Sequence, residues 1–168
     1  SSVDLTTIKA FQKALQESEE NYRKILDGAP YSILITRRND YRFVYLNDNF
    51  CRRMGYDREA VIGRTSLELG LYVNPDDRRL YFKTFEAEGR VDGMEIDFRT
   101  KSGEVFTNLM SGLPIRFDGQ DCLLSMAVDI TGRKRAEREL EKYRQHLEEM
   151  VRERTQALEA AQIGRAHV

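Results

Sequence analysis

The sequence has no apolar run long enough to cross a membrane, and it shows no secretory leader. Its longest apolar stretch, residues 122–128, has the length of a strand, whereas a membrane helix needs about 18 apolar residues. The formal net charge of −1 argues against a general binder of nucleic acid or anionic lipid, since neither polyanion would be attracted over a distance. We expect a cytoplasmic segment that does not insert into a membrane; an anchor upstream of Ser1 stays open.

Cysteine and histidine are scarce, with two of each in the chain. Cys51 and Cys122 lack motif spacing, which fits a reduced compartment and packing as small apolar side chains. The sequence has no His/Cys cluster with metal-ligand spacing and no Gly-rich loop that could cradle a phosphate. His146 lies in a charged helical stretch, and His167 lies in the last six residues. We therefore predict no metal site and no enzymatic activity for this chain.

The last six residues, 163–168, abandon the pattern that precedes them. They resemble the translation of a sequencing adapter, and the chain also begins without an initiator Met. We expect the natural sequence to end near Gln162 and the parent protein to continue beyond it. The alternative is a natural helix end with Gly164 as its C-cap.

The first 27 residues read as an amphipathic linker helix. Ile8, Leu15 and Tyr22 recur every seven residues, and Phe11, Ser18 and Ile25 each follow one of them by three, with the polar Ser18 as an imperfection. This spacing is an a/d seam of the kind that pairs helices. Gly28-Ala29-Pro30 ends the helix, because proline cannot continue it.

Residues 28–131 alternate strand and helix signals. The predicted strands are 32–36, 42–46, 93–100, 104–115 and 122–129. The predicted helices begin at caps and end at glycines: Asn47 to Gly55, Asp57 to Gly63, and Asn74 to Gly89. This order predicts an α+β domain with a five-stranded antiparallel sheet and short helices on one face. The last two strands are apolar on both faces, so we expect the flanking helices to cover the outer one.

A long charged helix is predicted from residue 132 to residue 162, about 46 Å at 1.5 Å per residue. Its few apolar residues form a narrow seam at Leu140, Tyr143, Leu147 and Val151. The spacing from Tyr143 onward includes an eleven-residue stutter, which locally unwinds a heptad coil. A parallel dimeric coiled coil would bury this seam. The alternative is a single helix that folds back on its own sheet.

The joint between the last strand and this helix is unusual. Thr131 is a good N-cap, yet three cations at residues 133–135 crowd the first turn, where the helix dipole favours anions. One hypothesis is that the joint is kept marginal so that a shift in the sheet can move the helix. The alternative is that the cations are solvated or reach back to Asp129.

The chain contains, in this order, the stretches YRKILDGAPYSILIT, VYLNDNFCRRMGYDREAVIGRT, NPDD, KSGE, LPIRFDG and AVDITGRKRAE. Together they resemble the PAS domain, a sensory module of bacterial signalling proteins, over residues 22–135. The resemblance implies that Asp129, Ile130 and Thr131 end the last strand and connect it to an output helix. The stretch 147–162 is similar to linkers that precede histidine-kinase or cyclic-dinucleotide-synthase domains.

The resemblance also names cofactors that can be weighed against the residues. A haem would need an axial histidine, which the predicted core lacks. The flavin-binding branch has a thiol where this chain has Ser66 and a glutamine where it has Ala127; only Asn108 matches. A thiol adduct is therefore not expected. Arg52 and Arg53 could lower the pKa of Cys51, but a packed thiol is the simpler interpretation.

A pocket between sheet and helices is the remaining candidate site. If Asn108 faces inward, strand parity brings Phe106, Met110 and Gly112 to the same face. Ser125 and Ala127 follow on the neighbouring strand, and the resemblance adds Leu34 and Thr36. A mostly apolar cavity with few polar groups suits a small organic ligand. The alternative is that these side chains fill the core and bind nothing.

We therefore predict a dimeric sensory or relay module that passes input through a coiled coil to a missing output domain, a histidine kinase. The alternatives are a cofactor-bearing sensor or a module of a cyclic-dinucleotide synthase. His146 lacks the His-Glu-x-x-x-Pro context of a phosphoacceptor. Glutamates beside the basic stretch GRKRAER argue against a nucleic-acid partner.

Overall fold

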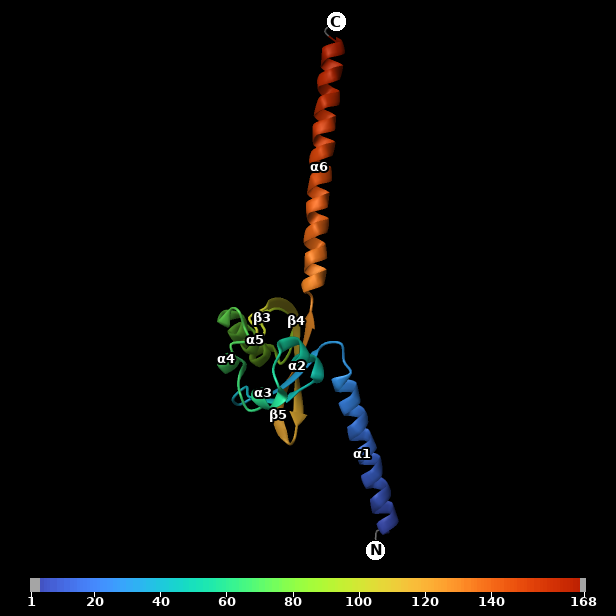
Figure 1. Ribbon diagram of the computed structural model, residues 1–168, viewed down its shortest axis with the longest axis vertical. Helices are drawn as coiled ribbons and strands as arrows, with labels where there is room; N and C mark the ends of the chain where they lie inside the picture. Colours follow the sequence, from blue (N-terminus) through green and yellow to red (C-terminus); the bar gives the residue numbers. More distant parts are fainter. Residues whose placement is uncertain (1–3, 167–168) are drawn as a thin grey trace. The chain divides into compact units, whose positions relative to one another are not determined.

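The computed structural model describes residues 4–166, and the chain divides into two compact units (Figure 1). One unit ends at Asp129 and the other begins at Ile130. The elements of the first unit are α1 (Leu5–Asp27), β1 (Ser32–Arg37), β2 (Phe43–Leu46), α2 (Asp48–Met54), α3 (Arg58–Val61), α4 (Ser66–Leu69), α5 (Pro75–Glu88), β3 (Val91–Arg99), β4 (Val105–Phe117) and β5 (Gln120–Asp129). The second unit is the helix α6 (Thr131–Ala166).

The five strands form one antiparallel sheet in the order β2-β1-β5-β4-β3, and α2 to α5 lie on one of its faces (Figure 1). The predicted α+β fold class is thereby confirmed. Asp118 and Gly119 join β4 to β5 with φ of 49° and 73°. Positive φ at both central residues matches the right-handed twist of the strands, which keeps the two long strands in register.

The helix caps mostly follow the sequence. Asn47 and Asn74 cap α2 and α5 through their side-chain oxygens, and Gly55 and Gly89 end these helices in the left-handed conformation. The predicted end of α3 at Gly63 is wrong, because α3 stops at Val61 and Ile62 takes the cap position.

Helix α4 was not predicted. The Thr65 side chain accepts a hydrogen bond from the amide of Glu68, and Gly70 ends the helix with φ of 64°. The spacing of Thr65 and Glu68 is the capping-box pattern, which is a signal that could have found α4.

The core lies between the sheet and the helical face. It is built from aliphatic and aromatic side chains, the largest of which are Tyr81, Phe50 and Phe85. The opposite face of β4 and β5 is apolar too, as predicted: Leu113 and Val128 are exposed, and Leu109, Leu124 and Met126 are half-buried.

Helix α6 corrects two details of the sequence analysis. In the first backbone hydrogen bond of the helix, Lys134 N donates to Ile130 O. Ile130 therefore takes the cap position, and Thr131 is the first helical residue. The helix continues through Gly164 to Ala166, so the alternative of a C-cap at Gly164 is wrong. Within residues 4–166, no helix is both long and apolar enough to span a bilayer.

Candidate functional site

The seven residues predicted to form a pocket all lie on the helix-facing side of the sheet. Each of them is at most 6% exposed. They come from three neighbouring strands: Leu34 and Thr36 from β1, Ser125 and Ala127 from β5, and Phe106, Asn108 and Met110 from β4. The register places Leu34 opposite Ser125 and Met110 opposite Ala127. Strand parity and the resemblance therefore selected one continuous buried surface.

A small cavity lies over part of this surface. Four of the seven residues line it: Leu34, Thr36, Met110 and Ser125. Its wall is completed by Phe43, Ser66, Leu71, Tyr72, Tyr81, Phe82 and Phe98. Phe106, Asn108 and Ala127 lie outside this lining. The cavity volume is about 20 Å³, enough for about one water molecule, so side chains fill the space in this conformation.

Tyr81 is the largest of the fully buried side chains that line the cavity. It reaches from α5 to the sheet, where its hydroxyl donates a hydrogen bond to Ser125 Oγ at 2.9 Å. Burial raises the pKa of Tyr81 to about 12. Gly112 makes room for the ring, because a Cβ there would stand 2.5 Å from Tyr81 Oη. Glycine at this strand position is thus a condition for the filled core.

Two further hydroxyls line the cavity. Thr36 Oγ1 is buried and has no hydrogen-bond partner among residues 4–166, an arrangement that costs about 1–3 kcal/mol. Ser66 Oγ accepts a hydrogen bond from Arg78 Nε at 2.9 Å, and the Arg78 guanidinium lies over the Phe82 ring. Ser66, the position at which the flavin branch has its thiol, therefore orients an arginine here.

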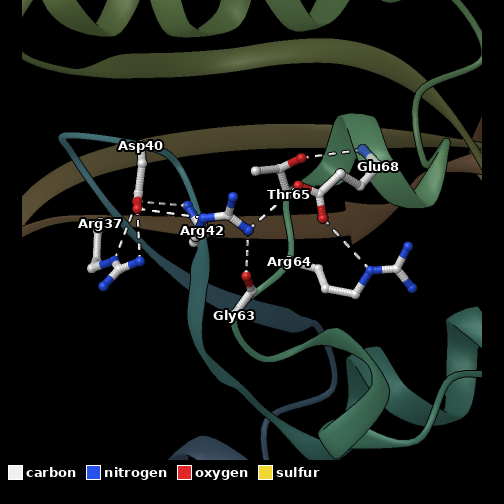
Figure 2. Close-up of polar contacts among 7 residues, drawn as sticks. All are labelled: Arg37, Asp40, Arg42, Gly63, Arg64, Thr65 and Glu68. Carbon is white, nitrogen blue, oxygen red and sulfur yellow. Dashed lines mark hydrogen bonds and ion pairs between the residues drawn. The ribbon is translucent and has the colours of Figure 1, made fainter.

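Polar contacts tie the turn between β1 and β2 to the loop before α4 (Figure 2). The Asp40 carboxylate pairs with Arg37 at 2.6 Å and accepts the amide of Arg42 at 3.2 Å. Arg42 Nη1 in turn donates to Gly63 O at 2.7 Å and to Glu68 Oε1 at 3.4 Å. These side chains are partly exposed, so each contact is weak, but together they fix α4 as one wall of the cavity.

A second cluster surrounds Asp129, the last residue of β5. Asp129 follows Ser125 and Ala127 by strand parity and therefore faces the helical layer. Arg53 of α2 donates from Nε to Asp129 Oδ2 at 2.9 Å, and both of its terminal nitrogens lie 3.3 Å from the Glu104 carboxylate. Its guanidinium also lies 3.7 Å from the centre of the Phe106 ring. The sequence pointed only to the cations at residues 133–135 as partners of Asp129, because Arg53 lies 76 positions away in the chain.

The cysteines do not have the surroundings of reactive thiols. Burial raises the pKa of Cys51, although Arg58 opposes this shift, and burial also raises the pKa of Cys122. The described part of the chain contains no group of three or more His, Cys, Asp or Glu placed to hold a metal ion. His146 is exposed on α6, and His167 lies outside the described residues.

Comparisons with known proteins agree with this architecture. A methyl sulfide methyltransferase-associated sensor from Methanosarcina acetivorans is 28% identical over 125 residues, which are 74% of this chain and 12% of that protein. The PAS domain of an HTR-like protein from Haloarcula marismortui has a TM-score of 0.62 at 22% identity, covering 73% of this chain and 99% of its own. The PAS domain of a two-component sensor histidine kinase has a TM-score of 0.58 at 16% identity, covering 68% of this chain and 97% of its own.

The sequence profile of the PAS domain matches residues 30–132, which is more than half of the chain and includes every strand of the sheet. The chain spans only a small part of the curated sensor that it matches. The chain therefore belongs to the PAS domain family.

Proposed function

We propose that this chain is a dimeric relay module, which passes input from the PAS core through a coiled coil of α6 to a downstream output domain, a histidine kinase. The observation that carries the proposal is the uncovered seam of α6. Leu140, Tyr143, Leu147 and Val151 are between 42% and 69% exposed, on a helix that is otherwise charged. An isolated helix gains nothing from such a seam, whereas two copies would bury it.

The first unit offers a second surface for pairing. On α1, the seam residues Phe11, Leu15, Tyr22 and Ile25 are all more than 60% exposed. The outer face of β4 and β5 is also apolar and partly exposed, with Leu113 and Val128 at its centre and end. A second copy that contributes its own α1 and sheet would cover both surfaces, which is the natural use of apolar area of this extent.

The proposed sensory role is supported by the curated relative, and the proposed histidine-kinase output by one solved relative. The curated relative is named as a sensor, and one solved relative is the PAS domain of a two-component sensor histidine kinase. In such a protein, α6 would extend toward the output domain. Its 36 residues correspond to about 54 Å at 1.5 Å per residue, long enough to transmit a shift between two helix arrangements.

Sedimentation velocity of this chain tests the pairing. We expect a dimer at micromolar concentration, a monomer for Leu147→Glu, and an unchanged dimer for Gln156→Glu, which adds the same charge off the seam. A wild-type chain that stays monomeric at high concentration would overturn the proposed pairing.

Insertions after Lys142 in the full-length protein test the transmission. Seven residues keep the seam in phase and should preserve signal output, whereas two or four should derange it. Equal output from all three lengths would show that α6 does not transmit by coiled-coil packing.

A further inference from the structure

The start of α2 is bound to the end of α1 through one buried side chain. Asn47, which is 0% exposed, donates from Nδ2 to Leu26 O at 2.8 Å and to Tyr31 O at 2.9 Å. Its Oδ1 accepts the amides of Ile33 at 3.0 Å and Phe50 at 3.2 Å. One amide group therefore joins the last turn of α1, the first strand and the first turn of α2.

Asp27, the last residue of α1, strengthens this joint. Its Oδ1 accepts the amide of Asp48, the first residue of α2, at 3.3 Å. Arg58 bridges the same two carboxylates, at 2.7 Å from Asp48 and 3.6 Å from Asp27. Any displacement of the last turn of α1 must therefore move or strain the start of α2.

The far end of α2 is bound to Asp129, the last residue of β5. Arg53 lies one residue from the end of α2 and holds Asp129, which is followed directly by Ile130 and α6. The backbone carbonyl of Met54 accepts the amide of Lys101 at 2.9 Å, which fixes this end against the turn between β3 and β4. Helix α1 is thus attached to one end of α2, and Asp129, which precedes Ile130 in the chain, is attached to the other end.

We infer that α2 is a strut that couples α1 to the start of α6, with Asn47 and Asp27 as the input contacts and Arg53 as the positioning residue for the output. This inference rests on the proposed relay function. It adds that a displacement of α1 is transmitted through α2 as well as through the sheet. The seven residues of α2 span about 10 Å and are stiff along the helix axis. A rigid element with a defined contact at each end can carry a displacement between two sites.

The two ends of the strut differ in strength. The contacts of Asn47 are fully buried, whereas the Arg53 side chain is 28% exposed and its carboxylate partners Asp129 and Glu104 are more exposed still. Partly exposed ion pairs are screened by salt and worth less than buried hydrogen bonds. We therefore expect the ion pair between Arg53 and Asp129 to break before the hydrogen bonds of Asn47 when α1 is displaced.

Amide hydrogen exchange of this chain tests the output contact. Arg53→Gln should speed exchange of the Lys134 amide, in the first turn of α6, by about three- to tenfold, the loss of one charge-assisted hydrogen bond. Arg53→Lys should restore part of the protection. Glu104→Gln is the matched control, because it removes the other carboxylate partner and leaves the Asp129 contact. The inference would be overturned if Arg53→Gln and Glu104→Gln changed the exchange rate of the Lys134 amide equally. It would also be overturned if Arg53→Gln raised the exchange rates of amides in β3 and β5 by the same factor as that of Lys134. Either result would show that Arg53 only stabilises the domain in general.

A double-mutant cycle tests the coupling itself. Asp27→Asn weakens the input joint and should change exchange of the Lys134 amide in the wild-type background but not in Arg53→Gln. Additive effects, or no effect of Asp27→Asn on Lys134, would refute the strut. Exchange is measured within one chain, so these outcomes are independent of the sedimentation and insertion results that decide the proposed function.

Discussion

Replacing Gly112 by alanine should destabilise the core, because this glycine lies under the ring of Tyr81. The added Cβ would stand 2.5 Å from Tyr81 Oη and 3.0 Å from Leu123 Cδ1, so the ring must move. Overpacking costs about 1–3 kcal/mol, and the lost hydrogen bond to Ser125 costs about 1 kcal/mol. Alanine returns about 0.5–1 kcal/mol, since glycine is the less favourable residue in a strand. The expected net loss is about 2 kcal/mol of unfolding free energy.

Urea denaturation followed by circular dichroism measures this loss, and Tyr81→Phe supplies the decisive comparison. Tyr81→Phe alone should cost about 1 kcal/mol, because the Ser125 hydroxyl loses its partner. It also removes the atom nearest to the new methyl group, so the double variant should be about 1 kcal/mol more stable than the sum of the single effects. Gly132→Ala, whose Cβ would meet no atom of the described structure within 4 Å, is the control and should not destabilise the chain. Additive effects of the first two changes would refute the steric argument.

Three further predictions concern buried groups. Thr36→Val removes a hydroxyl without a partner among residues 4–166 and should stabilise the chain by about 1 kcal/mol in a thermal melt; a lower midpoint would mean that the hydroxyl is bonded. Burial raises the pKa of Tyr81 and Tyr45 to about 12, so stability present below pH 10 should be lost as pH rises toward 12, with late ionisation at 295 nm; simultaneous ionisation of all tyrosines near pH 10 would contradict this. The raised pKa of Cys51 should make its alkylation at pH 8 slower than that of a free cysteine, and an equal rate would show an accessible thiolate.

The sheet and most helix ends could be predicted because their signals are local. Alternation along β3 and strand parity from Asn108 along β4 specified which side chains face the helices. The caps at Asn47 and Asn74 depend on neighbouring residues only. The end of α3 could not be read in the same way. Gly63 has φ of 82°, as a helix-ending glycine would. Its backbone N–H, however, donates a hydrogen bond to Phe43 O, which lies 20 positions earlier in the sequence. This long-range contact ends the helix earlier.

The sequence predicted which strand residues form the buried surface of the candidate site. It did not predict the cavity volume or the contacts between this surface and the helices. Strand parity placed Ser125 and Met110 on the buried face. The same parity, continued from Ala127 by two residues, would have placed Asp129 there too. Its partner Arg53 follows from how α2 packs over the sheet, which no local pattern specifies. The cavity volume likewise depends on whether Tyr81 of α5 reaches the sheet, and that depends on an open position at Gly112.

Some of the charges of α6 pair within the helix itself. Around Tyr143, Arg144 pairs with Glu141 at 2.6 Å and with Glu148 at 2.8 Å, and Lys142 lies 3.6 Å from Glu139. Coiled-coil helices commonly choose their partners through charges that flank the seam. Side chains already engaged along their own helix contribute less to that choice. In the proposed coiled coil, discrimination against helices of other sensors would then depend on the shape of the seam, where a bulky tyrosine and an irregular spacing would fit a copy of the same chain better than a regular heptad.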